Sequence, residues 1–538
     1  MQMSQKPKIT GTYFDQPVKE LESYCLPSNQ SLDQYQSGSD DGSNGVQQSI
    51  HNPDQYCTLD SSSGMQNSSS TASFSPDGSP VSLQNYSYPS DHHSPEYTWG
   101  SPISGSRVID NENDLGHMIR QLETAMLGSD LDNSDLHSIA ASGRATEVST
   151  EEEKWKYMME MIARGDLKEL LCACAKTIEK KDMYMADCLI TQLHQMVSVS
   201  GEPMQRLGAY MVEGLVARLA SSGSSIYNAL RCKEPAGAEL LSYMHILYEI
   251  CPYFKFGYMS ANGAIAEAMK EESRVHIIDF HIAQGSQWLT LIHALASRPG
   301  GPPRICITGI DDPTSSFARG GGLEIVGQRL HKLAESCKVP FEFHAAVISG
   351  TEVQLENLRI QPGEAIAVNF AMMLHHMPDE SVGTENHRDR LLRLVKSLSP
   401  KVVTLVEQEA NTNTAPFLPR FMETMDHYLA IFESIDVSLP REHKERISTE
   451  QHCLAREIVN IIACEGPERV ERHELLGKWR SRFIMAGFTP SPLSSFVNNT
   501  IKTLLQSYCD KYTLEERDGV LYLGWMNRAI VTSCAWRC

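Results

Sequence analysis

Asp279 and Gly285 occupy the positions where a cofactor-binding α/β domain has its first turn. The stretch RVHIIDFHIAQGSQW (274–288) places an acid after an apolar run, and a loop with a single glycine then precedes an apolar helical pattern. Sites for nucleotide-like cofactors need several glycines in this turn, because the backbone must approach the ligand closely. Only Gly285 meets that need. The pattern therefore predicts the fold of such a site without its ligand-admitting loop.

Asp311 follows the next strand-like run, RICITGI (304–310), at the place of a ribose-binding acid. Together with Asp279 and Gly285 it would form half of a cofactor site. The missing glycines favour another role for Asp279, in which it caps the next helix or ties down the loop. We therefore predict no cofactor. The alternative hypothesis is that Asp279, Gly285 and Asp311 bind S-adenosylmethionine or another small ligand.

Other chemistries have weaker support. The segment LHHMPDE (374–380) sets two histidines near two acids, but a metal site would need ligands from elsewhere in the chain. Ordinary loop and cap histidines are favoured, so no metal is predicted. Glu407 and Glu409 end another strand-like run and are acid–base candidates by fold analogy alone. Neither a phosphate-binding GxxxxGK[ST] nor a GxSxG motif occurs, so no catalytic residue is predicted.

The elements that would position these residues alternate between strand and helix from Arg274 onward. Continuous apolar strands separated by helical patterns predict a parallel sheet covered on both faces. After them, turn signals at Asp518-Gly519 and Asn527-Arg528 predict an antiparallel closing ribbon. This is the layout of class I methyltransferases, an α/β fold with a Rossmann-type core. The predicted strands are VHIIDF (275–280), RICITGI (304–310), FEFHAAV (341–347), AIAVNFAM (365–372) and VVTLVEQE (402–409).

A helical block precedes the first strand and is expected to form a cap on the core. Its clearest helix is LKELLCACAKTIEKKD, whose apolar residues share one face. That face consists of Leu167, Leu170, Leu171, Cys174, Ala175 and Ile178. Further helical patterns run through MADCLITQLHQMVSV, QRLGAYMVEGLVARLA and LLSYMHILYEICP.

Residues 1–150 differ in composition from the rest of the chain. They carry 6 Lys and Arg against 19 Asp and Glu and are rich in Ser, Asn, Gln and Gly, which predicts a disordered tail. Within it, DLGHMIRQLETAMLGSDLD (114–132) has apolar residues at helical spacing. It is expected either to fold into a partner's groove or to pack back on the main domain, and its periodicity does not decide between the two.

Charge and hydropathy restrict the class of partner. No apolar run is long enough to cross a bilayer, so no membrane association is expected. The 14 cysteines show no paired zinc spacing, which favours free thiols in an intracellular protein. Residues 151–538 carry 41 Lys and Arg against 48 Asp and Glu, without a long basic run. Contact with DNA would therefore require a basic surface assembled by folding.

The last part of the chain resembles the GRAS family of plant transcriptional regulators. Five family regions occur in order within a GRAS domain at 158–538, and Cys534 replaces the serine of the final signature. The regions are leucine repeat I at about 165–225, VHIID at 244–309, leucine repeat II at 325–357, PFYRE at 366–460 and SAW at 463–538. The motif residues are Val275, His276, Ile277, Ile278, Asp279, Pro400, Phe421, Tyr428, Arg456, Glu457, Ala535 and Trp536.

The start of the chain, YFDQPVKELESYCL, and the later RQLETAMLG resemble the phytochrome A signal transduction (scarecrow-like) branch of that family. The resemblance implies a methyltransferase-like core with an α-helical cap and no catalysis. It further implies a transcriptional regulator or co-regulator in light, hormone or stress signalling, in the nucleus and the cytoplasm. Expected partners are other regulators, including GRAS proteins in homo- or hetero-dimers, with or without DNA contact. The alternatives are a ligand-binding enzyme or sensor and a scaffold without transcriptional output.

Overall fold

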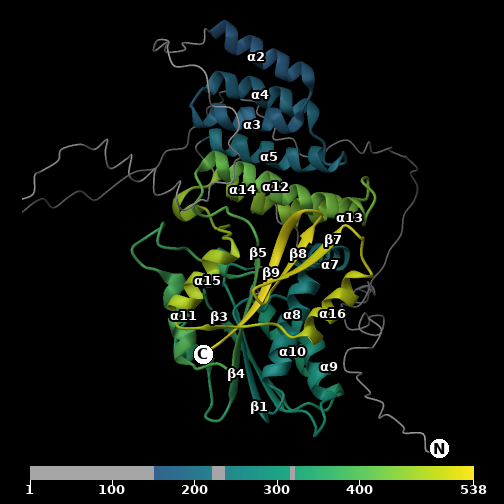
Figure 1. The fold of residues 1–538 in the computed structure, drawn as a ribbon, viewed down its shortest axis with the longest axis vertical. Helices are drawn as coiled ribbons and strands as arrows, with labels where there is room; N and C mark the ends of the chain where they lie inside the picture. The colour runs from purple at the N-terminus through teal and green to yellow at the C-terminus, as the bar shows by residue number, and fades with distance from the viewer. Residues whose placement is uncertain (1–150, 221–236, 316–320) are drawn as a thin grey trace, which may run out of the picture. The chain divides into compact units, whose positions relative to one another are not determined.

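The structure is a computed structural model that describes residues 151–220, 237–315 and 321–538. The predicted disordered tail and its helical segment at 114–132 lie outside the described residues. The same holds for residues 221–225 at the predicted end of leucine repeat I. Within the described part, one mixed sheet is covered by helices and joined to a separate layer of helices (Figure 1).

The described residues form one nine-stranded sheet in the order β3-β2-β1-β4-β5-β9-β8-β7, with β6 paired to β9. The first five strands are parallel and lie within one or two residues of their predicted positions, so the Rossmann-type prediction is confirmed. Their bounds are β1 Arg274–Asp279, β2 Arg304–Asp311, β3 Phe341–Val347, β4 Ala365–Ala371 and β5 Val402–Gln408.

The apolar strands are buried on both faces, as their continuous hydrophobicity requires. Adjacent residues of β1 point to opposite cores: Ile277 belongs to the cluster that includes α8, α9 and α10, and Ile278 to the cluster that includes α11 and α15. These helices are α8 Pro252–Ala268, α9 Ser286–Ala296, α10 Gly322–Ser336, α11 His387–Ser397 and α15 Leu476–Met485.

The closing ribbon consists of β7 Tyr512–Arg517, β8 Val520–Trp525 and β9 Arg528–Arg537. Asp518 and Gly519 both have positive φ and form the first predicted turn, which suits a two-residue hairpin loop. The second turn is Met526-Asn527, one residue earlier than predicted, because Arg528 already pairs with Trp525. The short strand β6 Thr489–Ser491, which contains a proline, was not predicted.

The predicted helical cap is confirmed. It comprises α2 Glu151–Arg164, α3 Leu167–Glu179, α4 Met183–Met196 and α5 Pro203–Leu219. In Figure 1 this layer lies beyond α12 Phe417–Asp436 and α14 Ala455–Ala463, on which α5 packs. All six apolar residues predicted for the inner face of α3 are buried. Other helices of the described residues are α7 Gly237–Ile250, α13 Lys444–Thr449, a π-helix Glu450–Leu454 and α16 Ser495–Leu505, together with 3-10 helices at Leu355–Leu358, Leu374–His376 and Gly466–Glu468.

A buried arginine fixes the cap to the core. The Arg206 guanidinium donates to Glu450 at 3.1 Å, to Asp436 at 2.7 Å and to the carbonyl of Phe432 at 3.0 Å. Arg446 also donates to the Glu450 carboxylate. Buried charges are tolerated where they are paired and hydrogen-bonded in this way, so this network sets how α5 lies against α12.

Candidate functional site

Asp279 ends β1, Asp311 ends β2 and Gly285 lies in the turn after β1, at the edge of the sheet where ligands bind in open α/β sheets. The carboxylate of Asp279 accepts hydrogen bonds from Trp288 Nε1 at 2.8 Å and Asn369 Nδ2 at 3.0 Å. Burial raises the pKa of Asp279, and these two donors oppose the rise. Asp279 thus ties β1 to β4 and α9. It does not cap α9, whose N-cap residue is Gly285.

Asp311 serves the turn instead of facing an open crevice. Its Oδ2 accepts a hydrogen bond from the backbone amide of Ala283 at 3.2 Å, and its Oδ1 accepts one from Asp312 at 2.9 Å. The amide of Ile282 donates to the carbonyl of Ile310 at 3.2 Å. Two amides of the turn, which in a cofactor site would lie close to the ligand, are therefore bonded within the chain.

Side chains fill the same space. Ile282 is buried, and a Cβ added at Gly309 would lie 2.7 Å from its Cδ1. Gly285 has a φ of 68°, and a Cβ there would lie 2.7 Å from Cγ1 of Val326 on α10. This glycine is therefore required by its backbone conformation and by the packing of the turn against α10.

His276 is the polar side chain that precedes Asp279 within the VHIID motif. Its Nδ1 lies 2.8 Å from Glu364 Oε2, and its Nε2 lies 2.8 Å from Thr308 Oγ1. Burial lowers the pKa of His276. Both ring nitrogens are paired with neighbouring side chains, so the VHIID motif residues act inside the sheet.

The LHHMPDE segment lies at the carboxyl end of β4, beside β5. Glu407 accepts hydrogen bonds from the amides of Met373 at 3.2 Å and Leu374 at 2.7 Å, and its Oε2 lies 2.6 Å from His375 Nδ1. Glu409 accepts a hydrogen bond from the amide of Leu476 at 2.9 Å. Glu407 therefore holds the start of the LHHMPDE segment and the His375 ring, and Glu409 holds the backbone at the start of α15.

Sequence reasoning missed the residues that join this cluster from a distant segment. Glu471 and His473 follow α14 and are buried. Glu471 Oε2 lies 3.6 Å from His375 Nε2 and 3.4 Å from His376 Nε2, while His473 Nδ1 lies 3.0 Å from Thr412 Oγ1. The run ERHE (471–474) looks like a solvated loop, and only its position between two helical patterns could have drawn attention to it.

The PFYRE residues contribute to the core next to this cluster. Tyr428 donates to Glu457 Oε2 at 2.6 Å. Burial raises the pKa of Glu457 to about 7, and the nearby charge of Glu471 adds to the rise. Pro400 and Phe421 are buried, and Arg456 lies beside Glu457 on α14.

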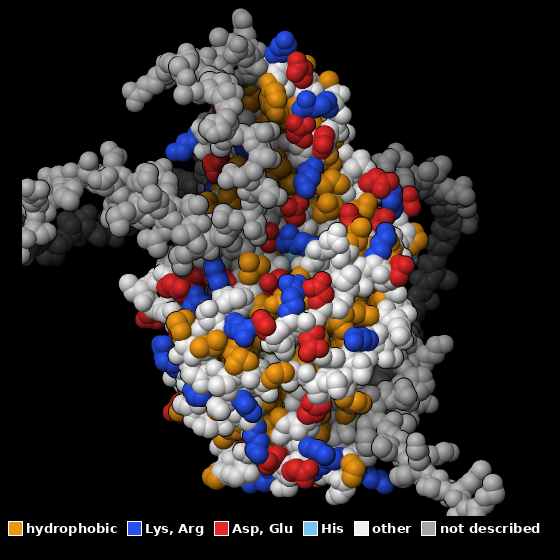
Figure 2. Space-filling view, viewed as in Figure 1, with side chains coloured by type: hydrophobic (Ala, Val, Ile, Leu, Met, Phe, Trp, Pro, Cys, Tyr) orange, Lys and Arg blue, Asp and Glu red, His pale blue; other side chains and the backbone are white. Residues whose placement is uncertain are grey.

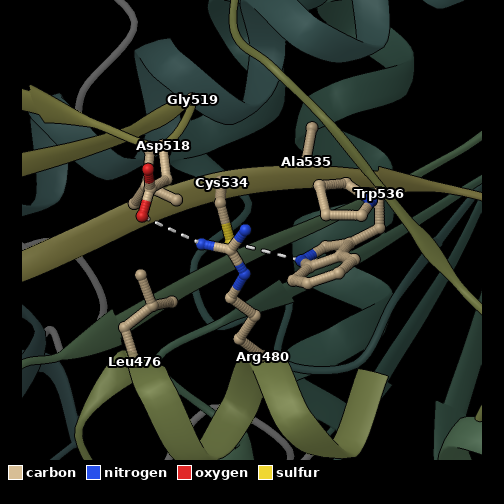
Figure 3. Close-up of a pocket in the computed structure, with 9 residues that line it drawn as sticks. Leu476, Arg480, Asp518, Gly519, Cys534, Ala535 and Trp536 are labelled. Atoms are coloured by element: carbon tan, nitrogen blue, oxygen red, sulfur yellow. Dashed lines mark hydrogen bonds and ion pairs between the residues drawn. The ribbon is translucent and has the colours of Figure 1, made fainter. Parts of the chain in front are cut away.

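The SAW residues Ala535 and Trp536 are buried in β9. Trp536 stacks on Phe483 with 4.9 Å between ring centroids, and its Nε1 donates to Cys534 Sγ at 3.2 Å. Figure 3 shows Cys534, Ala535 and Trp536 beside a cavity of about 10 Å³, which is room for about one water. Arg480 and Asp518 form an ion pair of 3.3 Å beside it.

Within the described residues, two exposed regions are considered as contact surfaces. On the outer cap helices, Tyr157, Met159, Met183 and Tyr184 are between 53 and 69% exposed. The helices α11 and α15 carry seven Lys and Arg and one acid. Arg388 and Arg482 are buried and paired with carboxylates, so the basic surface consists of the other five. Figure 2 shows Lys and Arg side chains over the part of the surface where Figure 1 places these two helices. In the described part of the chain, no helix is long and apolar enough to cross a membrane.

Comparison with known proteins assigns this geometry to a family. The model of the GRAS domain family matches residues 167–537. Scarecrow-like transcription factor PAT1 of Arabidopsis thaliana is 69% identical over 434 residues, covering 80% of this chain and 88% of that protein. Chitin-inducible gibberellin-responsive protein 2 of Oryza sativa subsp. japonica is 59% identical over 530 residues, covering 97% and 95%. The crystal structure of SCL7 in Oryza sativa matches with a TM-score of 0.61 and 33% identity, covering 69% of this chain and 99% of that one.

Proposed function

This chain belongs to the GRAS domain family, whose members are plant transcriptional regulators, and we propose that it regulates transcription through its surfaces and without catalysis. The observation that carries the proposal is the filled crevice at Asp311. Because the amides of Ile282 and Ala283 bond within the chain and Ile282 fills the adjacent space, the turn offers little to a cofactor. Fold similarity to enzymes does not carry their chemistry with it.

The outer face of the cap is the proposed site for another GRAS chain, identical or related. Met183 and Tyr184 begin α4 and are exposed to solvent. Burying large apolar side chains against a partner is favourable in free energy, so their exposure supports a contact site here. We expect the full chain to associate and the double variant Met183→Ser, Tyr184→Ser to associate less, as measured by sedimentation. Met526→Ser removes an exposed apolar side chain at the far ribbon and serves as the control.

Direct DNA contact is assigned to the surface of α11 and α15. Arg390 and Lys396 donate hydrogen bonds to main-chain carbonyls, and these bonds do not neutralise their positive charges. Arg393 is exposed to solvent. Such a surface can neutralise phosphates even though the chain is acidic overall. Binding to a randomised duplex pool should weaken steeply with salt, and Arg393→Gln should lower the salt slope by about 1. Lys332→Gln on α10, on the other side of the sheet, should leave the slope unchanged.

The proposal extends to the signal and the compartment. The N-terminal segments YFDQPVKELESYCL and RQLETAMLG support membership of the phytochrome A branch, and the name of the gibberellin-responsive relative supports a hormone or stress input. A transcriptional role requires a nuclear pool, and a signalling role is compatible with a second, cytoplasmic pool. Imaging of the tagged full chain before and after light or hormone treatment tests both parts.

A recruitment assay tests the proposal itself. The full chain is fused to a heterologous DNA-binding domain and placed at a reporter promoter. We expect the reporter output to change, and an output equal to that of the DNA-binding domain alone would favour the scaffold hypothesis.

A further inference from the structure

The cluster of His375, Glu471 and His473 has the composition and geometry of a metal site. One ligand atom from each residue can be chosen so that all three lie within 4.8 Å of one another, and all three side chains are buried. His375 follows β4, whereas Glu471 and His473 come from the segment between α14 and α15. We propose that these residues bind one Zn²⁺ ion that clamps the two segments together.

The spacing of the candidate ligand atoms fits such an ion. Two ligands about 2.1 Å from a tetrahedral zinc ion lie about 3.4 Å apart. Glu471 Oε2 lies 3.6 Å from His375 Nε2 and 3.9 Å from His473 Nε2. These separations are too long for a hydrogen bond and close to those around a shared ion.

The hydrogen-bonding state of these atoms supports the same conclusion. Glu471 Oε2 and His473 Nε2 are buried atoms with no hydrogen-bond partner within the described residues. Buried polar groups are normally satisfied, so two unsatisfied atoms that face each other call for a third group between them. A cation satisfies both the carboxylate oxygen and the imidazole lone pair.

The Nδ1 atoms of His375 and His473, on the side of each ring away from Glu471, lie within hydrogen-bond distance of neighbouring side chains, as is usual for zinc-binding histidines. His375 Nδ1 lies 2.6 Å from the Glu407 carboxylate, which can only accept, so Nδ1 carries a proton and Nε2 is the donor atom to a metal. His473 Nδ1 lies 3.0 Å from Thr412 Oγ1. Glu407 is itself fixed by two backbone amides. Both rings are therefore oriented before any ion binds.

His376 lies beside the cluster but outside the set of three residues whose ligand atoms lie within 4.8 Å of one another, so the fourth position is left to a water molecule or to a shift of this side chain. Its Nε2 lies 3.4 Å from Glu471 Oε2, and its side chain is 40% exposed, which marks the solvent side of the cluster and a path for the ion. Two or three imidazoles and one carboxylate suit Zn²⁺ better than Mg²⁺ or Ca²⁺, which prefer oxygen ligands. The alternatives are an enclosed water molecule and a simple His376–Glu471 ion pair.

Metal analysis of the purified full chain tests the proposal, and it does not depend on any transcriptional assay. We expect about one Zn²⁺ per chain after dialysis, and near-complete loss of this zinc in His473→Gln and Glu471→Gln. His427→Gln removes a neighbouring buried histidine outside the ligand set and should keep the zinc. A zinc-free wild-type chain after exposure to Zn²⁺, or full zinc content in both ligand variants, would overturn the proposal.

Zinc bound to some of the 14 cysteines, or a ligand variant that fails to fold, would complicate the metal analysis. A second measurement on the wild-type chain therefore identifies the ligands directly. X-ray absorption at the zinc edge should show nitrogen and oxygen ligands near 2.0–2.1 Å. A spectrum dominated by sulfur at about 2.3 Å would instead place the ion on cysteines and refute this site. Chelation should lower Tm by a few degrees, and added Zn²⁺ should restore it.

Discussion

The carboxylate of Asp311 accepts a hydrogen bond from the backbone amide of Ala283, 3.2 Å away across the turn after β1. In a cofactor-binding relative of this fold, the acid after the second strand serves the ligand's ribose and the turn lies close to the ligand. Here the acid and the turn bond each other. The chain thus has the topology of such a site, and these polar groups hydrogen-bond to each other.

Asp311→Ala should lower the free energy of unfolding by about 1–3 kcal/mol, because it leaves two backbone amides without their acceptor. Urea denaturation of the full chain measures the change. Glu335→Ala, at an exposed position of α10, should stay within about 0.5 kcal/mol of the wild type. An Asp311 variant as stable as the control would mean that the turn does not depend on this acid.

Gly285→Ala should destabilise the fold by more than about 1 kcal/mol, since φ is positive and the added methyl group meets Val326. The same substitution at Gly477, near the start of α15, meets nothing within 4 Å and has no positive φ. Gly477→Ala should leave stability unchanged or raise it by up to about 1 kcal/mol. Equal effects at the two positions in urea denaturation would contradict the packing argument.

The charge of Asp379 should make stability depend on acid pH. Burial opposes its ionisation, yet Ser381 and Asn413 donate to it and Arg388 lies near, which together lower the pKa of Asp379 to about 2. A lowered pKa stabilises the fold above the unfolded value of 3.8, and that contribution is lost as the pH falls toward 2.

Asp379→Asn should therefore cost about 2 kcal/mol at pH 7, and the difference from the wild type should shrink by about half at pH 3. Urea denaturation at both pH values gives the comparison. A difference that is the same at pH 7 and pH 3 would show that the charge is not responsible. Glu335→Gln, at an exposed site, should show no difference at either pH.

Trp536→Ala should lower stability by about 3–5 kcal/mol, because it removes a buried indole that stacks on Phe483. Cys534→Ser should change it by about 1 kcal/mol or less, since a hydroxyl oxygen still accepts from Trp536 Nε1. Thermal denaturation distinguishes the two. A serine variant as unstable as the alanine variant would show that sulfur at position 534 is needed for packing.

The sheet could be predicted because its strands are continuous apolar runs separated by helical patterns. A continuous apolar run of this length, bounded by helical patterns, is typical of a parallel strand that is buried on both faces of a sheet. The inner face of α3 could also be predicted, from the helical spacing of its apolar residues. The strand β6 was not, because three residues with a proline become a strand only through pairing with β9.

The polar residues were harder to interpret for a physical reason. A charged run in the sequence looks the same whether water or partners satisfy it, and the run Glu471–Glu474 is buried because partners from elsewhere in the chain reach it. His375 and His473 are close in space but distant in the sequence, so no spacing rule links them. The cysteines, which were expected to be free thiols, are free at the 11 positions within the described residues.

Thermal denaturation of the full chain in rising concentrations of S-adenosylmethionine tests the central claim most directly. A ligand at 100 times its Kd would add about 2.7 kcal/mol of stability, and a known methyltransferase run in parallel shows that the assay detects it. With the turn bonded to Asp311 and the crevice filled by Ile282, we predict no change in Tm at any concentration. A concentration-dependent rise in Tm would contradict the account and would establish that the crevice still binds the cofactor.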